Sequence, residues 1–233
     1  MKKNSKIFLA GSSGLVGSAI YRELKTQGYK NIIITKRKVL NFLNKKKTEI
    51  FLKKNKPDYV IIASAKVGGI LSNKMFPAEY IYENLQIELN LIHGSYQAGV
   101  KNLLFLGSSC VYPKNCKQPI KEKYLLNGQL EETNEAYAVA KIAGIKMCEF
   151  YSKQYKLNYF TVMPCNVFGS NDNYNITSSH FIPAIINKVH NAKIKNKKKI
   201  TLWGSGKPLR EVIYSNDLAK ACVFLLKIRA VLS

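Results

Sequence analysis

Residues 6–17 read Lys6-Ile7-Phe8-Leu9-Ala10-Gly11-Ser12-Ser13-Gly14-Leu15-Val16-Gly17. A short apolar run, typical of a buried strand, leads directly into the spacing G-x-x-G-x-x-G, and helical spacing of apolar residues begins at Leu15. Glycines between a strand and a helix permit a tight turn and let the backbone approach a pyrophosphate, while the helix N-terminus offers free N–H groups. The stretch therefore predicts the first strand, turn and helix of a dinucleotide-binding fold.

The same alternation of short apolar runs and longer helical segments continues along the chain. Strands are predicted at 6–10, 31–35, 59–63, 103–107 and 159–163, and helices at 15–27, 46–55, 83–98 and 137–155. The strands are apolar throughout rather than alternating, as expected where both faces of a sheet are covered. The pattern predicts an α/β fold, a Rossmann-type doubly wound parallel sheet with helices on both faces.

The composition changes after residue 168. A polar, turn-rich stretch, an amphipathic helix, a basic loop, a short strand and a final helix are predicted at 169–179, 181–190, 193–199, 200–203 and from about 215 onward. We therefore expect two domains, 1–168 and 169–233, with the last helix packing back on the first. Because no Pro/Ser-rich linker separates them, the two parts are expected to share an interface.

The composition is that of an ordinary globular protein, with 46% apolar and 22% charged residues among 233. It excludes intrinsic disorder, collagen-like repeats and disulfide-stapled miniproteins. The five cysteines show no C-x-x-C spacing, so neither a disulfide framework nor a metal site is expected, and a reducing compartment fits best. The apolar run before the glycine loop is too short for an export signal, and no run reaches the ~18 apolar residues of a membrane helix. We expect a cytoplasmic protein without a membrane partner.

The chain is strongly basic, since 37 Lys and Arg against 14 Asp and Glu give a formal net charge of +23. Such an excess favours anionic ligands or polyanions. The basic run K-I-K-N-K-K-K at 193–199 suggests a nucleic-acid-binding module, but no nucleic-acid fold motif or stacking platform accompanies it. Because the lysines are spread over predicted helices and loops, a solvated basic surface is the better interpretation, and no specific nucleic acid partner is expected.

The second predicted strand ends in Lys36-Arg37-Lys38. A site for NAD usually places an acidic residue here, on the ribose 2′-hydroxyl. Basic side chains favour a 2′-phosphate and therefore NADP(H), although solvated lysines in a lysine-rich protein give the same pattern.

Tyr137 and Lys141 are four residues apart and lie on the same face of a predicted helix. An unperturbed tyrosine has a pKa near ~10, and an adjacent ammonium lowers that pKa, so the pair can transfer a proton to or from a substrate oxygen. Y-x-x-x-K alone is more often a surface pair. Ser108 follows the fourth strand at the carboxyl edge, where parallel sheets place their ligands, and makes an active site the favoured interpretation.

Six motifs together give the chain a resemblance to a known family. They are Gly11 to Gly17 (GSSGLVG), Ala65 to Ile70 (AKVGGI), Leu106 to Pro113 (LGSSCVYP), Asn134 to Gly144 (NEAYAVAKIAG), Met163 to Gly169 (MPCNVFG) and Trp203 to Glu211 (WGSGKPLRE). Along essentially its whole length the chain resembles the GDP-L-fucose synthases, a branch of the extended short-chain dehydrogenase/reductase family. The glycine loop and Y-x-x-x-K belong to the whole superfamily, whereas AKVGGI, GSSCVYP and WGSGKPLRE are much narrower signals.

The resemblance implies an enzyme that performs 3,5-epimerisation and then NADPH-dependent 4-reduction of GDP-4-keto-6-deoxy-D-mannose to GDP-L-fucose. It implies that Cys110 and His180 exchange protons with the carbons that flank the ketone. Ser108 is expected to hydrogen-bond the ketone oxygen and Tyr137 to protonate it. Lys141 is expected to acidify Tyr137 and to hold the nicotinamide ribose.

The resemblance also implies which residues contact the cofactor and the nucleotide-sugar. For the cofactor, NADP(H), these are Gly11, Ser12, Ser13, Gly14, Leu15, Val16, Gly17, Arg37, Leu106, Gly107, Lys141, Pro164, Asn166, Val167 and His180. For the GDP-sugar they are Lys188, Trp203 and Arg210. An aromatic ring and two cations suit a planar guanine and a diphosphate.

Three features depart from the family pattern. Ser13 stands where some relatives carry Arg, and the segment 40–44 ends in Asn where an acidic residue is frequent, which weakens the NADP prediction. Relatives continue well beyond Ser233, so 169–233 is expected to be only part of the nucleotide-sugar domain. Two other interpretations stay open: another nucleotide-sugar epimerase or dehydratase, or a truncated NADP-binding protein with impaired catalysis. As is common in the family, a homodimer is expected, through the helices predicted at 83–98 and 137–155.

Overall fold

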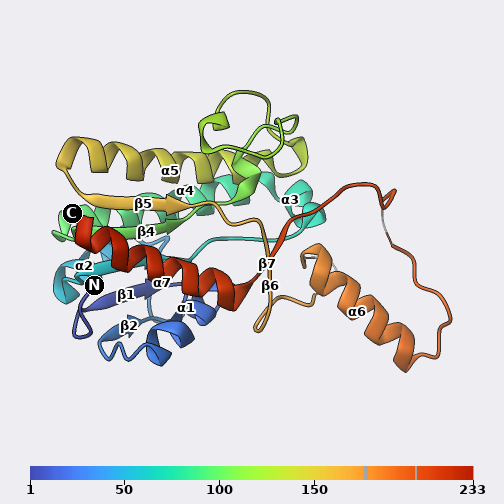
Figure 1. The fold of residues 1–233 in the computed structure, drawn as a ribbon, viewed down its shortest axis with the longest axis horizontal. Coiled ribbons are helices and arrows are strands. Elements are labelled where there is room, and N and C mark those ends of the chain that lie inside the picture. The colour runs from blue at the N-terminus through green and yellow to red at the C-terminus, as the bar shows by residue number, and fades with distance from the viewer. Residues whose placement is uncertain (176–177, 203, 233) are drawn as a thin grey trace.

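A five-stranded parallel sheet forms the centre of the molecule (Figure 1). The computed structural model describes residues 1–175, 178–202 and 204–232. In sheet order the strands are β2 (Ile32–Ile34), β1 (Ile7–Ala10), β3 (Tyr59–Ile62), β4 (Asn102–Leu106) and β5 (Asn158–Val162). Ile7 pairs with Ile32 on one side and with Tyr59 on the other. The predicted parallel α/β fold is confirmed.

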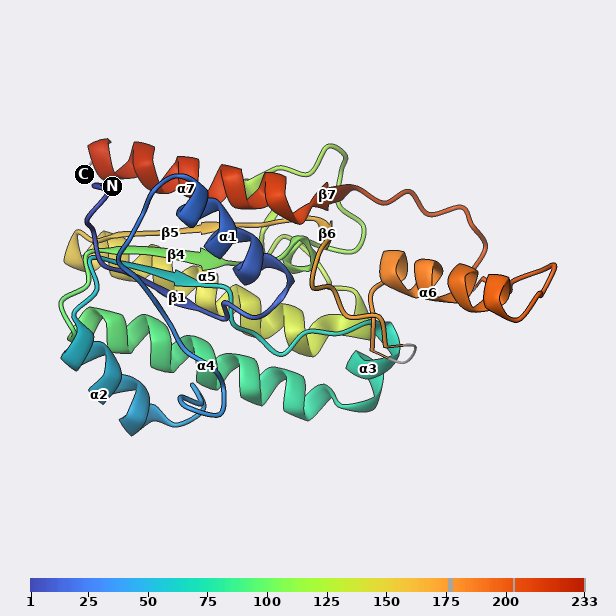
Figure 2. The ribbon, with the colours of Figure 1, turned by 90° about the horizontal axis from the view of Figure 1, so that it is seen from below.

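Helices cover both faces of this sheet (Figure 2). On one face lie α1 (Leu15–Thr26) and α7 (Ser215–Leu232), and on the other lie α2 (Lys45–Asn55), α4 (Pro77–Gln97) and α5 (Glu135–Tyr155). The short α3 (Ile70–Met75) precedes α4, and α6 (Phe181–Ile194) lies beyond the carboxyl ends of the strands. Single 3-10 turns are η1 (Ser109–Val111), η2 (Glu122–Tyr124) and η3 (Glu132–Asn134).

Each face of the sheet has its own apolar core, because alternate residues of a strand point to opposite faces. In β1, Phe8 packs with the helices α2, α4 and α5, whereas Ile7 and Leu9 pack with α1 and α7. All four residues of β1 are fully buried. This explains why the strands are apolar throughout.

The predicted strand at 200–203 is wrong over the residues that the structure describes. Residues 200–202 form no strand, and Trp203 lies outside the described residues. Ile200 and Leu202 have exposed side chains, so nothing packs on this short run to hold it extended. Instead β6 (Asn166–Phe168) and β7 (Val212–Tyr214), neither of which was predicted, pair in parallel as a second, two-stranded sheet.

The chain returns to the main sheet after β7. Helix α7 packs along α1, and Leu218, Cys222 and Leu226 are almost fully buried in the core of that face. The division of the chain into domains 1–168 and 169–233 stays a prediction.

Two further observations concern membrane insertion and the state of the cysteines. In the described residues, no helix is both long and apolar enough to cross a bilayer. All five cysteines are free, with Cys148 and Cys222 buried and the other three partly exposed.

Candidate active site

The glycine loop joins β1 to α1 with a geometry that larger residues would block. Gly11 has φ +88°, and a Cβ at this position would lie 2.7 Å from the Ala63 carbonyl group. A Cβ on Gly17 would lie 2.0 Å from the Gly11 carbonyl oxygen. Gly14 precedes α1, so within the described residues no side chain caps this helix, and its first turn holds no acidic residue. The first amides of α1 therefore form a site for an anion.

Ser108 and Cys110 lie immediately after β4, in the turn that enters η1. The Ser108 hydroxyl oxygen accepts hydrogen bonds from the Cys110 amide (3.4 Å) and from Cys110 Sγ (3.1 Å). The Ser109 amide donates to the Pro164 carbonyl at 3.0 Å and ties this turn to the segment after β5. Burial raises the pKa of the Cys110 thiol, although the Ser108 hydrogen bond opposes the rise. Thiol and hydroxyl thus form one polar pair at the carboxyl edge of the sheet.

Tyr137 lies in the first turn of α5, one turn before Lys141. Burial is the main cause that raises the pKa of Tyr137 well above its ordinary value, followed by the electrostatic effects of Cys110 and Glu88. A hydrogen bond with Ser108 opposes this rise. Lys141 is not among the groups that shift this pKa, since its ammonium faces a carboxylate, and its acidifying role stays a prediction. The phenol is therefore protonated at neutral pH and is a proton donor.

That carboxylate belongs to Glu88 on α4, a residue that was not predicted. Lys141 Nζ lies 3.2 Å from Glu88 Oε1, and the two side chains are 3% and 1% exposed. The ammonium also donates to the Leu106 carbonyl at 3.1 Å and lies 4.5 Å from the centre of the Phe105 ring. Burial raises the pKa of Glu88 to about 7, against the lowering effect of Lys141. The site thus holds a buried ion pair, Lys141 with Glu88, next to Tyr137.

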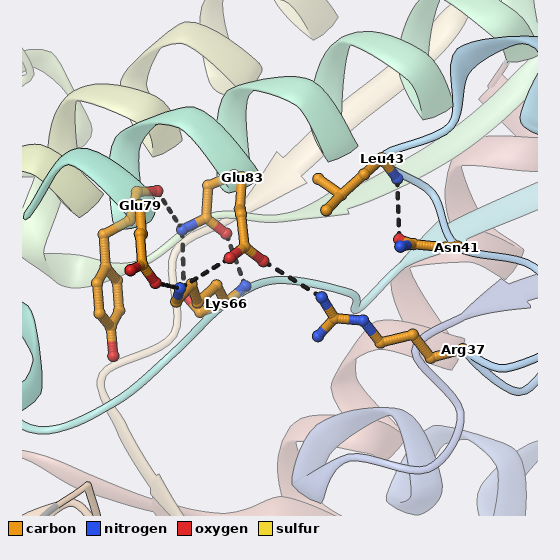
Figure 3. Close-up of polar contacts among 8 residues, drawn as sticks. Arg37, Asn41, Leu43, Lys66, Glu79 and Glu83 are labelled. Carbon is orange, nitrogen blue, oxygen red and sulfur yellow. Dashed lines mark hydrogen bonds and ion pairs between the residues drawn. The ribbon is translucent and has the colours of Figure 1, made fainter. Parts of the chain in front are cut away.

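Arg37 lies in the turn after β2 and belongs to a chain of charges (Figure 3). Its Nη2 atom lies 3.4 Å from Glu83 Oε2 on α4, and its side chain is 74% exposed. Glu83 Oε1 also accepts from Lys66 Nζ at 2.7 Å, and Lys66 is paired with Glu79 as well. Burial lowers the pKa of Lys66, but the hydrogen bonds with Glu79 and Glu83 outweigh this and raise it. Arg37 keeps a mostly free guanidinium at the carboxyl edge of β2.

The AKVGGI segment after β3 is held in place through its backbone. The buried Asn84 accepts from the Lys66 amide (2.8 Å) and donates to the Lys66 carbonyl (3.0 Å). A Cβ on Gly68 would lie 2.2 Å from the Tyr80 hydroxyl oxygen, and a Cβ on Gly69 would lie 2.4 Å from the Ser179 carbonyl oxygen. The two glycines therefore allow the segment to pack closely against α4 and against the residues before His180.

His180 directly precedes α6 and is exposed. The preceding residues are docked on the AKVGGI segment, since the Gly69 amide donates to the Ser178 carbonyl at 2.9 Å. Partial loss of water around the ring lowers the pKa of His180, while the charge of Asp172 opposes the shift. Within the described residues no hydrogen bond or ion pair joins His180 to Cys110, so their opposition across a substrate stays a prediction.

The segment from β5 to β6 carries the other predicted cofactor contacts. Pro164, Asn166 and Val167 are half-buried, and Asn166 Nδ2 donates to the Glu211 carbonyl at 2.9 Å. The Gly107 amide donates to the Val162 carbonyl at 2.9 Å. These contacts bring the ends of β4 and β5 together beside Ser108.

The predicted substrate contacts lie further out, on and after α6. Lys188 Nζ donates to the Thr201 carbonyl (3.0 Å) and Arg210 Nη1 donates to the Leu209 carbonyl (3.1 Å). Arg210 is exposed and Lys188 is partly buried, and among the described residues no hydrogen bond joins either of them to Ser108 or Tyr137. Trp203 lies outside the described residues. The roles of these three residues stay predictions.

Residues 7–231 match the NAD dependent epimerase/dehydratase family. The chain belongs to this family. It is 51% identical over 222 residues to the GDP-L-fucose synthase of Sinorhizobium fredii. This alignment covers 95% of this chain and 70% of the relative. It is 50% identical over 224 residues to GDP-L-fucose synthase 1 of Arabidopsis thaliana, covering 96% of this chain and 69% of the relative. A solved GDP-L-fucose synthetase from Naegleria fowleri, bound to NADP, is 28% identical with a TM-score of 0.86 over 97% of this chain and 74% of that one.

These likenesses confirm the family resemblance found in the motifs. Ser108, Cys110, Tyr137 and Lys141 come together at the end of β4, and the roles assigned to them stay predictions. Glu88, Glu83 and Lys66 contribute charges to the site that were not predicted.

Proposed function

We propose that this chain catalyses the NADPH-dependent 3,5-epimerisation and 4-reduction of GDP-4-keto-6-deoxy-D-mannose to GDP-L-fucose. The observation that carries the proposal is the meeting of Ser108, Cys110 and Tyr137 after β4, at the carboxyl edge of the sheet that also carries the glycine loop after β1. The relatives at 50–51% identity, which are GDP-L-fucose synthases, support the same substrate and reaction.

The residues fit the cofactor NADPH. The turn at Gly11 and Gly17 leaves a cradle that a Cβ would fill, and the uncapped N-terminus of α1 suits a pyrophosphate. The exposed Arg37 guanidinium suits a 2′-phosphate, and Lys141 suits the hydroxyls of the nicotinamide ribose. Leu106, Pro164 and the other predicted contacts complete this set. When bound, NADPH supplies the hydride for the reduction.

For the reduction, we assign the proton donor to Tyr137. Its phenol is protonated at neutral pH, because burial keeps its pKa high. Ser108 hydrogen-bonds the same ketone oxygen and thereby orients the carbonyl group. The proton reaches the oxygen as the carbon is reduced, so no charged alkoxide accumulates in a partly buried site.

For the epimerisation, we assign the proton transfers to Cys110 and His180. The ketone acidifies both neighbouring C–H bonds, and inversion needs one group to remove a proton and another to return it on the opposite face. A thiol and an imidazole both exchange protons near neutral pH. Lys188, Trp203 and Arg210 are assigned to the GDP moiety.

We further propose the organisation around this site. Residues 1–168 bind the cofactor, and residues 169–233 contribute to the nucleotide-sugar site, with α7 packing on the cofactor domain. The enzyme acts in the cytoplasm as a homodimer formed through α4 and α5. Tyr82 and Leu89 on α4, and Val139 and Phe150 on α5, are exposed apolar side chains that suit such a contact.

The test is direct incubation of the purified chain with GDP-4-keto-6-deoxy-D-mannose and NADPH, with identification of the sugar product. We expect NADPH oxidation and GDP-L-fucose. Tyr137→Phe is the control, since it removes only the phenolic proton and is expected to abolish reduction while NADPH binding persists. A product epimerised or dehydrated without reduction would assign the chain to another branch of the family. NADPH binding without any turnover of the sugar would refute the proposed activity for this chain.

A further inference from the structure

The Lys141–Glu88 pair is buried more deeply than any other ion pair among the described residues. A carboxylate and an ammonium taken out of water lose favourable hydration, which their mutual attraction restores only when the geometry is good. Phe105 and Leu106 provide an apolar ring and one carbonyl oxygen to the ammonium. Glu88 is thus the charged group that compensates Lys141 at this depth.

The local packing is adapted to this carboxylate. Position 144 on α5 is glycine, and a Cβ there would lie 2.8 Å from Glu88 Oε2 and 2.7 Å from the Phe105 ring. Any side chain at Gly144 would therefore displace either the carboxylate or the ring on which Lys141 lies. The glycine leaves room for Glu88 in a helix where alanine would otherwise be favoured.

The contacts of the ammonium also determine which of its N–H groups remains for the active site. A lysine ammonium has three donors. The Leu106 carbonyl oxygen at 3.1 Å and Glu88 Oε1 at 3.2 Å occupy two directions on the inner side. The third donor is left for the side of Tyr137, whose ring centre lies 5.8 Å away.

We propose that Glu88 is a positioning residue that holds Lys141 charged and oriented toward Tyr137 and the nicotinamide ribose. This inference rests on the proposed function, because it takes Tyr137 and Lys141 as the groups that act in the reduction. Glu88 itself touches neither substrate nor cofactor and acts through Lys141.

The charged and titratable groups that face Glu88 come from α5: Lys141, Tyr137 and Cys148. From β4 the contact is the apolar ring of Phe105. Because the pKa of Glu88 is about 7, its carboxylate forms as the pH rises through neutrality. The reduction is therefore expected to gain activity over this range.

The decisive variant is Glu88→Gln, which keeps the volume and a hydrogen-bond acceptor but removes the charge. Its matched control is Glu49→Gln, which removes the carboxylate of the surface pair with Lys45 (3.9 Å) on α2. For each protein the measurements are kcat and KM for the GDP-sugar across pH 6–9, NADPH affinity by fluorescence titration, and deuterium uptake from heavy water at the carbons flanking the ketone.

We expect Glu88→Gln to lower the kcat for reduction by about 10- to 100-fold, the usual cost of losing a group that orients an active-site side chain. Its KM for the sugar and its deuterium uptake are expected to stay within about twofold to threefold of wild type, since Cys110 and His180 perform that exchange. Its NADPH affinity is expected to fall. Its kcat for reduction is expected to lose the rise with pH near neutrality that the wild type shows. Glu49→Gln is expected to match wild type throughout.

An unchanged pH profile and NADPH affinity in Glu88→Gln, with only a lower melting temperature, would overturn the proposal and leave Glu88 a packing residue. If Glu88→Gln does not fold, Glu88→Asp serves instead, and partial retention of the wild-type pH limb is expected because the charge remains. Absence of GDP-L-fucose from the wild type would refute the proposed function. In that case the NADPH titration still decides the role of Glu88, because weakened binding supports it and equal binding contradicts it.

Discussion

Three glycines leave space in the candidate active site that any larger residue would fill. Gly11 and Gly17 lie where one methyl group would collide with backbone, and Gly144 lies where it would collide with Glu88. The first two could be predicted, because they are adjacent in sequence to the strand and helix that they join. Glu88 could not, because it meets Lys141 only through the packing of α4 on α5. One signal was available: Glu88 shares a helix face with the buried Leu91 and stands where an apolar residue would be expected.

The first prediction concerns Cys110. Cys110→Ser keeps a hydrogen-bonding group next to Ser108 but replaces the thiol with a far weaker acid. We expect epimerisation to slow by roughly 10²- to 10⁴-fold, the usual contribution of a general acid or base, with a smaller loss in reduction. Deuterium uptake reports the first step and NADPH oxidation of a pre-epimerised substrate reports the second. Equal losses in both would mean that Cys110 is structural.

A second prediction concerns the pH dependence of stability. The pKa of Glu88 is about 7 in the folded protein against an ordinary 4.5, so the folded state holds a proton that the unfolded state has lost over this interval. The resulting stabilisation is complete below pH 4.5 and is lost as the pH rises through 7, a change of roughly 3 kcal/mol. Relative to Glu88→Gln, the wild type should therefore lose free energy of unfolding between pH 5 and pH 8, as measured by urea denaturation. A constant difference between the two proteins would contradict the prediction.

Elements that have a packing partner nearby were predicted within a few residues. The five strands of the main sheet and helices α1, α2 and α5 follow from runs of apolar residues whose spacing fits a covered sheet. Helix α4 begins at Pro77 rather than at 83, because proline suits the first turn of a helix. The second sheet was missed, because β6 and β7 are three residues each and are extended only through pairing with one another. The run at 200–202 has the composition of a strand but lacks such a partner.

The third prediction tests how strongly α7 contributes to the main fold. Leu226 is 1% exposed in the core between α7, α1 and the sheet. Leu226→Ala leaves a cavity there and is expected to cost about 2–5 kcal/mol of the free energy of unfolding. Phe224→Ala on the same helix is the control, since Phe224 is 60% exposed, and its effect is expected to stay near 0.5 kcal/mol. Similar midpoints in chemical denaturation for the two variants would show that α7 is not part of the cooperative core.

At the level of the complete chain, the outer face of α4 and α5 carries exposed apolar side chains. It exposes Tyr82, Leu89 and Phe150 in a protein of net charge +23. A contact between two copies through this face would bury these side chains and would keep the lysine-rich regions elsewhere in water.

The fourth prediction tests this contact. Leu89→Lys places two new ammonium groups in a symmetric interface, where like charges repel, and is expected to shift the protein from dimer to monomer. Light scattering coupled to size-exclusion chromatography measures the mass. The control is Ile50→Lys on α2, where a 56% exposed side chain is replaced outside the proposed contact. A wild-type chain that is already monomeric at micromolar concentration would refute the homodimer.

The order of the main sheet has a practical consequence for handling the protein. In the described part of the chain β5 pairs with β4 on one side only, and Arg229 of α7 lies 4.9 Å from the ring of Phe160 on this strand. An open strand edge is a template for pairing between chains, and the excess of positive charge holds copies apart when little salt is present. At 0.1 M ionic strength electrostatic repulsion reaches only about 10 Å, so concentrated samples should scatter more light as salt is added. Concentrated samples should therefore stay free of aggregates longest in low-salt buffers.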